Sequence, residues 1–363
     1  MIVLRFIIIV AVLIPSMSVA APSISSTSGT FTHGSSVTIS GSSFGSKGGT
    51  NANKPLIWAD FETSINPTSL GHYTAWASNQ GLTRQSSAPQ FGTSSWNVTA
   101  SFDGSGSFSL EPTGGVTTIY MYGKRYYNAS IQSDNLKFFR IWSDNIGDSV
   151  ASTSNSGIIL DENCYNGSRF QAVTLGRNAW NHDEFLWRQS TSGTCSPGTS
   201  TGNGYYEFIQ NGVQQQIYNN NFPTEKSPVV YGSPSSIGIR VMDNFTDAGD
   251  INGTSVWMDD LYVDNTFARV MIGNASTFAA STTREIQIPT AWADGSITVQ
   301  INRGSFGSSA SAYLYVIDAN NAVNTSGYAV TFGADGGGSS TGGGMDVKVP
   351  DPTKLFRASL HTQ

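Results

Sequence analysis

The side chains in this 363-residue sequence that could do chemistry include aromatic residues beside an arginine. Alternation along a strand puts Tyr120 and Tyr122 on one face, and it puts Arg140 and Trp142 on one face of a later strand. Sugars present apolar C–H faces rimmed by hydroxyls, so a sugar-binding sheet needs aromatic platforms beside polar groups. These four residues are the predicted glycan-binding set. The alternative is that the aromatics are core and Arg140 forms a salt bridge at a strand end.

A second group surrounds the segment 178–184, which contains a histidine next to two carboxylates. Elimination from a uronic-acid polymer needs a group that neutralises the carboxylate, a base such as His or Tyr, and a Tyr as acid. The residues that could supply this set are His182, Arg140, Lys137, Tyr122 and Tyr126. A lone histidine on a turn is common, so an ordinary surface role for it stays open.

Two carboxylates across a cleft would instead indicate a glycosidase, and a retaining enzyme needs them about 5–5.5 Å apart. Asp183 and Glu184 are adjacent, so on a strand they face opposite sides. No Glu-x-Asp-x-x-Glu pattern occurs in the sequence. We therefore do not expect a glycoside hydrolase.

A loop at 243–252 is rich in oxygen ligands, with Asp243, Asp247 and Asp250 as the candidate metal-binding residues. Ca²⁺ takes six to eight such oxygens. The spacing does not match an EF-hand, and a polar loop with Asx-turns is the alternative. No cofactor is expected beyond this possible structural Ca²⁺.

The two cysteines, Cys164 and Cys195, both lie in loop-like sequence rich in Gly and Ser. In an exported protein this predicts one disulfide, and the alternative is two free thiols. Residues 1–20 predict export, because they combine Arg5, an apolar core too short to span a bilayer and a small-residue cleavage pattern. We expect a mature protein with no membrane span, secreted to the extracellular space or the periplasm.

Composition narrows the class of partner. Charged residues make up 12% of the chain, where about 25% is usual, and the net charge is −6 without a basic cluster. This excludes nucleic acid as an expected partner. A polysaccharide or a cell-surface glycan is the expected partner, and the sequence does not give the oligomeric state.

The elements that would position these residues are short strands with alternating apolar residues, and no stretch has a helical period with caps. Asn211-Gly212 between two such strands predicts a hairpin. The predicted fold class is all-β.

The segment 22–45, with Val37-Thr38-Ile39-Ser40 and a closing Phe44-Gly45, resembles the start of an IPT/TIG immunoglobulin-like domain. The strands expected to continue it occur near the other end, at 269–273, 285–289, 292–299, 312–319 and 327–332. We therefore predict one small immunoglobulin-like β-sandwich split by an insertion, which costs little where the inserted ends lie close. The alternative is an independent C-terminal sandwich and a separate N-terminal strand pair.

The inserted strands begin with Trp58-Ala59-Asp60-Phe61-Glu62 and end with Trp257-Met258-Asp259-Asp260 followed by Leu261 to Asp264. This pattern resembles a concanavalin A-like jelly-roll sandwich, a fold shared by lectins, glucanases and polysaccharide lyases. The predicted domains are a signal peptide at 1–20, the first part of the immunoglobulin-like module at 21–55, the jelly roll at 56–265, the remainder of the module at 266–333, and a Gly/Ser linker with a short tail at 334–363.

Fold alone does not assign function. The functional prediction is a secreted glycan-binding or adhesion protein. The alternatives are a polysaccharide lyase acting by β-elimination on glycans that contain uronic acid, and a structural surface protein.

Overall fold

The computed structural model describes 20–48, 53–61, 64, 66, 68, 75, 78–79, 82–85, 97–101, 108–110, 117–127, 137–143, 147–154, 157–162, 176, 178–188, 193–194, 201–202, 204–218, 237–243 and 255–333. Within the strands between 78 and 257, side chains are described at 118–126, 139, 180–188, 205–210, 213–215 and 257. Every regular element in these ranges is a strand, apart from the single 3-10 turn η4 (Phe278–Ala280). The all-β prediction is confirmed.

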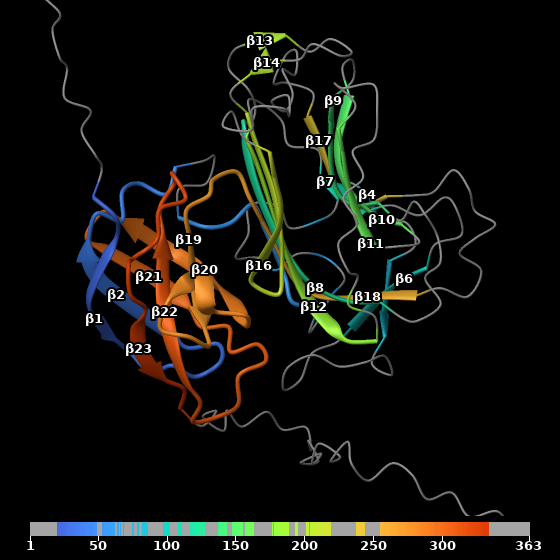
Figure 1. Ribbon diagram of the computed structural model, residues 1–363. Coiled ribbons are helices and arrows are strands. Elements are labelled where there is room, and N and C mark those ends of the chain that lie inside the picture. The colour runs from blue at the N-terminus through green and yellow to red at the C-terminus, as the bar shows by residue number, and fades with distance from the viewer. Residues whose placement is uncertain are drawn as a thin grey trace, which may run out of the picture.

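One seven-stranded sheet joins the two ends of the described chain (Figure 1). Its strands, in spatial order, are β1 (Ser23–Ser28), β2 (Ser36–Ser42), β21 (Ser296–Gln300), β20 (Arg284–Ala293), β19 (Arg269–Gly273), β22 (Ser311–Ile317) and β23 (Tyr328–Thr331). We call this sheet with its loops the small module. β20 has an irregularity between Pro289 and Ala291, so that its first part pairs with β19 and its second with β21.

The pairing of β2 with β21 is the long-range contact that closes the small module. Val37 stands opposite Val299 and Ile39 opposite Ile297, and all four side chains are fully buried in one core. Alternation explains this, because apolar residues two apart point to the same side of a strand. A split immunoglobulin-like module requires this pairing, while the domain boundaries themselves stay a prediction.

Two further sheets contain the remaining long strands. The eight-stranded sheet contains β16 (Val213–Tyr218), β15 (Tyr205–Gln210), β12 (Trp180–Arg188), β8 (Thr118–Tyr127), β18 (Ser255–Asp264), β6 (Asn97–Ser101) and β5 (Leu82–Gln85) in that order, with β3 (Ile57–Ala59) also paired to β18. The six-stranded sheet contains β11 (Gly157–Glu162), β10 (Gly147–Ser154), β9 (Lys137–Ser143), β17 (Ile237–Asp243), β7 (Phe108–Leu110) and β4 (Ser78–Asn79). A separate pair joins β13 (Gly193–Thr194) to β14 (Thr201–Gly202).

The eight-stranded sheet is covered on both faces, as Figure 1 shows for β12 and β8 between the small module and the strands β9 and β17. On one face, Phe185 packs against Phe139 of β9, with ring centroids 5.8 Å apart. On the other face, Leu186 joins a buried cluster that includes Met271 and Ile286 of the small module. Successive residues of β12 therefore enter two different cores, which is why seven consecutive residues from Asn181 are buried.

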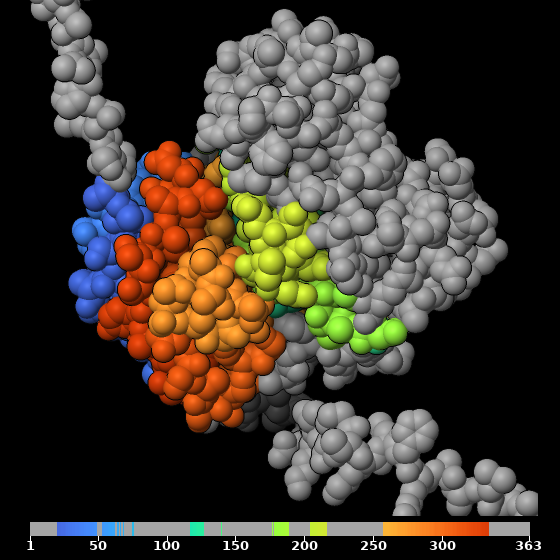
Figure 2. Space-filling model, in the orientation of Figure 1, coloured from blue at the N-terminus to red at the C-terminus, as the bar shows by residue number. Residues whose placement is uncertain are grey.

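The predicted hairpin at Asn211-Gly212 is confirmed. Both residues have positive φ, 50° and 73°, as the tight hairpin turn requires. The turn also docks on the small module, because the Arg284 guanidinium donates to the Gly212 carbonyl over 3.0 Å. Figure 2 shows this yellow-green segment packed against the orange part of the small module.

Within the described residues, we find no helix of the length and apolarity needed to cross a bilayer.

Candidate functional site

The sheet face that carries Tyr120 and Tyr122 is covered by the small module. Both tyrosines are fully buried. The Tyr120 hydroxyl donates to Glu184 Oε2 over 2.9 Å, and the Tyr122 hydroxyl donates to the Arg284 carbonyl over 2.9 Å. Burial raises the pKa of both phenols well above the ordinary value, with Glu184 the next cause for Tyr120 and Glu285 for Tyr122. These tyrosines hold two layers together, so the prediction that they form an exposed sugar platform is corrected.

Charged side chains on the same covered face are paired across the boundary with the small module. Glu184 lies 3.3 Å from an Arg284 nitrogen and 3.7 Å from an Arg269 nitrogen. Lys124 lies 2.9 Å from Glu285. Buried charges need such partners because their desolvation is costly. This part of the face therefore acts as an ion-paired interface within the chain.

His182 belongs to this interface and not to a surface turn. Its ring is stacked on Tyr122 with centroids 6.0 Å apart, and its Nε2 lies 3.8 Å from Glu184. Burial, followed by the positive charges of Lys124 and Arg284, lowers its pKa well below the usual value. A neutral imidazole is a suitable base, yet only 4% of this residue is exposed. The described geometry brings His182 and Tyr122 together but leaves no room for a polymer beside them.

Arg140, Trp142 and Lys137 lie on β9, which belongs to the six-stranded sheet and not to the sheet of β8. Arg140 and Trp142 therefore do not share a sheet with Tyr120 and Tyr122, and their part in glycan binding stays a prediction. Phe139 between them has a positive φ of 55°, and the register of β9 against β10 shifts nearby. The side chains of Arg140, Trp142 and Lys137 lie outside the described residues.

Beyond the small module, the same face of the eight-stranded sheet ends in three aromatic side chains, which we call the aromatic row: Trp180, Tyr126 and Trp257. They stand directly opposite one another on β12, β8 and β18. The Tyr126 ring lies 5.8 Å from Trp180 and 5.5 Å from Trp257, edge-to-face in both cases. All three are partly exposed, in contrast to the buried residues of the interface.

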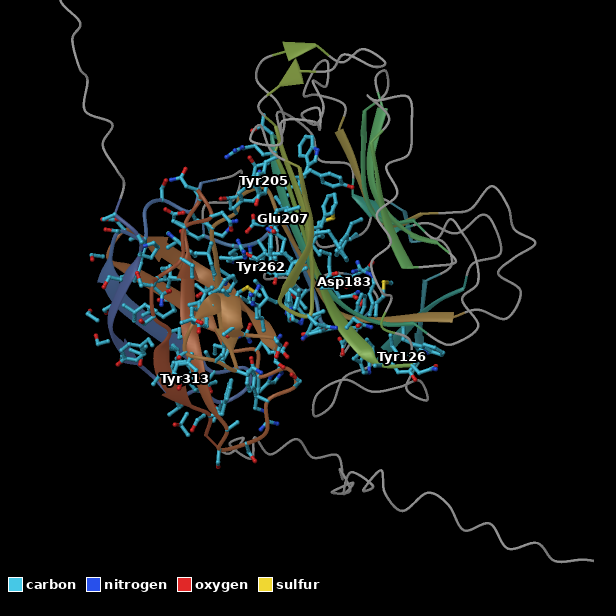
Figure 3. The ribbon with its side chains drawn as sticks, in the orientation of Figure 1. Tyr126, Asp183, Tyr205, Glu207, Tyr262 and Tyr313 are labelled. Atoms are coloured by element: carbon cyan, nitrogen blue, oxygen red, sulfur yellow. The ribbon has the colours of Figure 1, made fainter. Side chains whose placement is uncertain are left out.

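Figure 3 shows where the aromatic row lies, since Tyr126 is drawn at the end of the sheet remote from Tyr313 of the small module. Tyr126 was predicted as a lyase residue. In the structure, Lys124 stands directly opposite His182, and Tyr126 lies two residues further along β8, opposite Trp180. Trp180 and Trp257 were not predicted as site residues. Only the pairing of three strands distant in sequence brings them into line with Tyr126, and no local pattern carries that register.

The predicted metal site and the predicted disulfide concern side chains that the structure does not describe. The side chains of Asp243, Asp247 and Asp250 lie outside the described residues, as do both Cys164 and Cys195. Where the structure does describe side chains, no three His, Cys, Asp or Glu residues are grouped as a metal would require. The metal site and the disulfide stay predictions.

Comparison with known proteins gave matches only at the level of structure, since no family model and no curated protein matches the sequence. The cellulose-induced protein Cip1 is 14% identical, with 58% of this chain and 97% of that one covered and a TM-score of 0.39. Domain 4 of the arabinanase AbnA from Geobacillus stearothermophilus is 13% identical (58% and 92% covered, TM-score 0.37). The alginate lyase vAL-1 from Chlorella virus is 13% identical (52% and 92% covered, TM-score 0.36).

Similarity this low carries no argument about what the chain does. The described residues show, by themselves, stacked antiparallel sheets of the β-sandwich type. None of the three matches supports the IPT/TIG resemblance, which stays a prediction.

Proposed function

We propose that this chain is a secreted glycan-binding or adhesion protein and that the aromatic row is its sugar-contacting surface. The proposal keeps the concanavalin A-like jelly roll as the fold of the inserted region, with an immunoglobulin-like module of the IPT/TIG kind beside it. The observation that carries it is the alignment of three partly exposed aromatic rings across adjacent strands.

The chemistry of the aromatic row suits a sugar. An aromatic ring offers an apolar face to the C–H face of a pyranose, while Tyr and Trp also carry a polar group for hydroxyls. The row lies on paired strands of the sheet interior, where neighbouring strands fix the spacing of the rings. A rigid aromatic surface of this kind binds without the ordering cost that a mobile loop incurs.

The alternative of a polysaccharide lyase is weaker on these grounds. Its candidate base and acid, His182 and Tyr122, touch each other but are covered by the small module. Arg140 and Lys137, the candidate neutralising groups, lie on a strand of another sheet. A purely structural role is the remaining alternative, and the experiment below separates all three.

The test measures both retention and turnover on one panel. Purified protein is passed over gel-immobilised neutral and uronic-acid polysaccharides, and the same polymers are incubated with it while the ultraviolet absorbance of unsaturated uronates is followed. We expect retention without new absorbance. Trp180→Ala and Trp257→Ala should each weaken retention by about 1–3 kcal/mol, by analogy with base stacking on aromatic side chains.

The matched control is Tyr313→Ala, which truncates a partly exposed aromatic residue on the small module, remote from Tyr126 in Figure 3. It should leave retention unchanged. New absorbance that disappears in His182→Ala would establish the lyase instead. Absence of both signals on the whole panel would leave the structural role.

A further inference from the structure

We propose that the side chains of Lys47 and Asp264 condense to an intramolecular amide, a cross-link between two positions 217 residues apart. Lys47 follows β2 on the small module, and Asp264 is the last residue of β18 in the eight-stranded sheet. The chain leaves the small module after the first and returns to it after the second. The cross-link therefore joins the two ends of the intervening region, and it does not depend on the proposed function.

The Lys47 ammonium and the Asp264 carboxylate are in direct contact and withdrawn from water. Nζ donates to Oδ2, and 0% and 1% of the two side chains are exposed. Burial raises the pKa of the Asp264 carboxyl, an effect that Lys47 and the hydrogen bonds from Tyr262 and Asn265 offset only in part. Burial disfavours charge, and proton transfer from the ammonium to the carboxylate gives the amine and the acid that react.

The hydrogen bonds around the pair suit an amide better than an ammonium. An ammonium has three N–H donors, and in the described part of the chain Lys47 Nζ has two acceptors, Asp264 Oδ2 and the Lys54 carbonyl at 3.3 Å. An amide nitrogen keeps one N–H, which the Lys54 carbonyl can accept. The Asn265 backbone N–H donates to Asp264 Oδ1 over 2.9 Å, so this oxygen has a partner when it becomes the amide oxygen. Condensation therefore removes both buried charges and the surplus donor.

Two donors to Asp264 supply what the reaction needs. The Tyr262 hydroxyl, at the boundary of the two layers in Figure 3, donates to Oδ2 over 2.9 Å. Burial, followed by Asp264, raises the pKa of Tyr262 well above its usual value, so the phenol stays protonated and can donate. The Asn265 N–H points at Oδ1, where negative charge develops when an amine adds to the carboxyl carbon.

The step balances without a co-reactant. The ammonium first passes one proton to the carboxylate, and the Nζ lone pair then attacks Cγ to form the C–N bond. The Cγ–Oδ2 bond breaks, and Tyr262 gives a proton to the leaving oxygen and regains one from the nitrogen. Oδ2 departs as water with two of the three ammonium protons, and the third remains on the amide.

The fold holds the reacting groups in place beforehand. The Thr266 hydroxyl donates to the Lys47 carbonyl over 2.7 Å, and Trp292 Nε1 donates to the Gly45 carbonyl over 3.1 Å. These bonds fasten the lysine segment at two points, while Asp264 ends a paired strand. Well-oriented intramolecular reactions reach effective molarities of about 10⁵–10⁸ M. The bond should therefore form after folding without another protein.

The test is a tryptic digest of the purified natural protein, unfolded and reduced before digestion. Trypsin cleaves after a free lysine but not after one whose Nζ is an amide. We expect no cleavage after Lys47 and one branched peptide that contains Lys47 and Asp264, lighter by one water than the two linear peptides together. Cleavage after Lys124, whose ammonium is also held in a buried ion pair, is the control for access by the protease. Separate linear peptides with both residues unmodified would overturn the proposal.

Two variants test the roles of the side chains. Lys47→Arg keeps a cation for Asp264, but a guanidinium that stays charged is a poor nucleophile, so the branched peptide should disappear. A branched peptide at Asp264 in this variant would overturn the assignment of Lys47. Tyr262→Phe keeps the buried ring and removes the donor to Oδ2. Its branched peptide, sampled at intervals after a pulse of synthesis, should accumulate at least about ten-fold more slowly. An unchanged rate would overturn the role of Tyr262 as proton relay.

Discussion

The Lys124 ammonium of β8 and the Glu285 carboxylate of β20 form an ion pair at 2.9 Å although 161 positions separate them, and almost none of either side chain is exposed. Replacement of Lys124 by Met leaves Glu285 buried without its cation, although Tyr122 and Ser305 still donate hydrogen bonds to it. Loss of one partner of a buried pair costs about 3–5 kcal/mol, so we expect a decrease of that size in the free energy of unfolding. Urea denaturation measures it.

The double variant Lys124→Met with Glu285→Gln is the control for that prediction. It removes both charges, so it should recover part of the lost stability. A single variant within about 0.5 kcal/mol of the natural protein, the size of an ordinary surface change, would contradict the role of this pair.

Asp260 gives the chain a pH dependence of known sign. Burial, with Glu285 as the next cause, raises its pKa to about 7. The ordinary pKa of an aspartate is near 3.8, so between about pH 4 and 7 the folded state holds a proton that the unfolded state has already released. The free energy of unfolding therefore decreases as the pH rises through this window. Asp260→Asn should be increasingly more stable than the natural protein over that window, with a constant difference above it.

Asparagine suits the test because Asp260 has a positive φ of 52° and its Oδ2 accepts a hydrogen bond from Asn302, both of which an amide tolerates. Unfolding free energies at pH 4, 5, 6, 7 and 8 provide the measurement. A stability difference that does not change between pH 4 and 7 would show that Asp260 titrates at its usual pKa.

His182 should act with the opposite sign. Its pKa is lowered by burial and then by Lys124 and Arg284, so the unfolded state binds the proton more readily. The contribution of His182 to the free energy of unfolding is fully present above pH 6.5, the approximate pKa of the histidine in the unfolded state. It decreases as the pH falls below that value. His182→Phe should reduce the loss of stability between pH 7 and 5, and an unchanged slope of stability against pH would contradict this.

Gly212 has a packing role beyond its turn conformation. A Cβ there would lie 2.1 Å from the Ser281 carbonyl oxygen, and φ is +73°. Gly34 has a similar φ of +78° with no neighbour within 4 Å of a Cβ, so Gly34→Ala isolates the conformational cost, about 1–2 kcal/mol. We expect Gly212→Ala to cost clearly more than Gly34→Ala in thermal or urea unfolding. Equal costs would show that the hairpin can move away from the small module.

The predicted disulfide between Cys164 and Cys195 can be tested directly. Mass spectrometry of an unreduced digest, after export under oxidising conditions, should give one peptide that contains both cysteines. Reduction should then lower stability by about 3–4 kcal/mol for a loop of this length in the chain-entropy model. Two free thiols in the unreduced digest would refute the bond.

Local patterns predicted the parts of the fold that depend on neighbours in sequence. Asn211-Gly212 predicted its hairpin because only residues that tolerate positive φ fit that turn. Val37 and Ile39 were correctly expected in a strand, since apolar alternation reports which residues share a face.

What covers a face is a different question, and there the sequence was insufficient. Tyr120 and Tyr122 share a face as alternation requires, but that face meets the small module and not solvent. The register of β18 with β8 shifts between Asp259 and Tyr262, where Asp260 has a positive φ. Such shifts depend on packing between distant strands, so Trp257 could not be placed beside Tyr126 in advance.

The pairing of β2 with β21 also has a consequence for biosynthesis. Thr38 and Thr298 are 260 positions apart and their hydroxyls lie 3.3 Å from each other in the finished protein. A ribosome adds about 5–20 residues per second, so the β1–β2 hairpin waits on the order of tens of seconds before its partner strand exists. During that interval an unpaired strand edge with Val37 and Ile39 is exposed to other nascent chains. We therefore expect the yield of folded protein to depend strongly on the holdase chaperones of the expression host. The stability of the folded protein alone would not indicate this dependence.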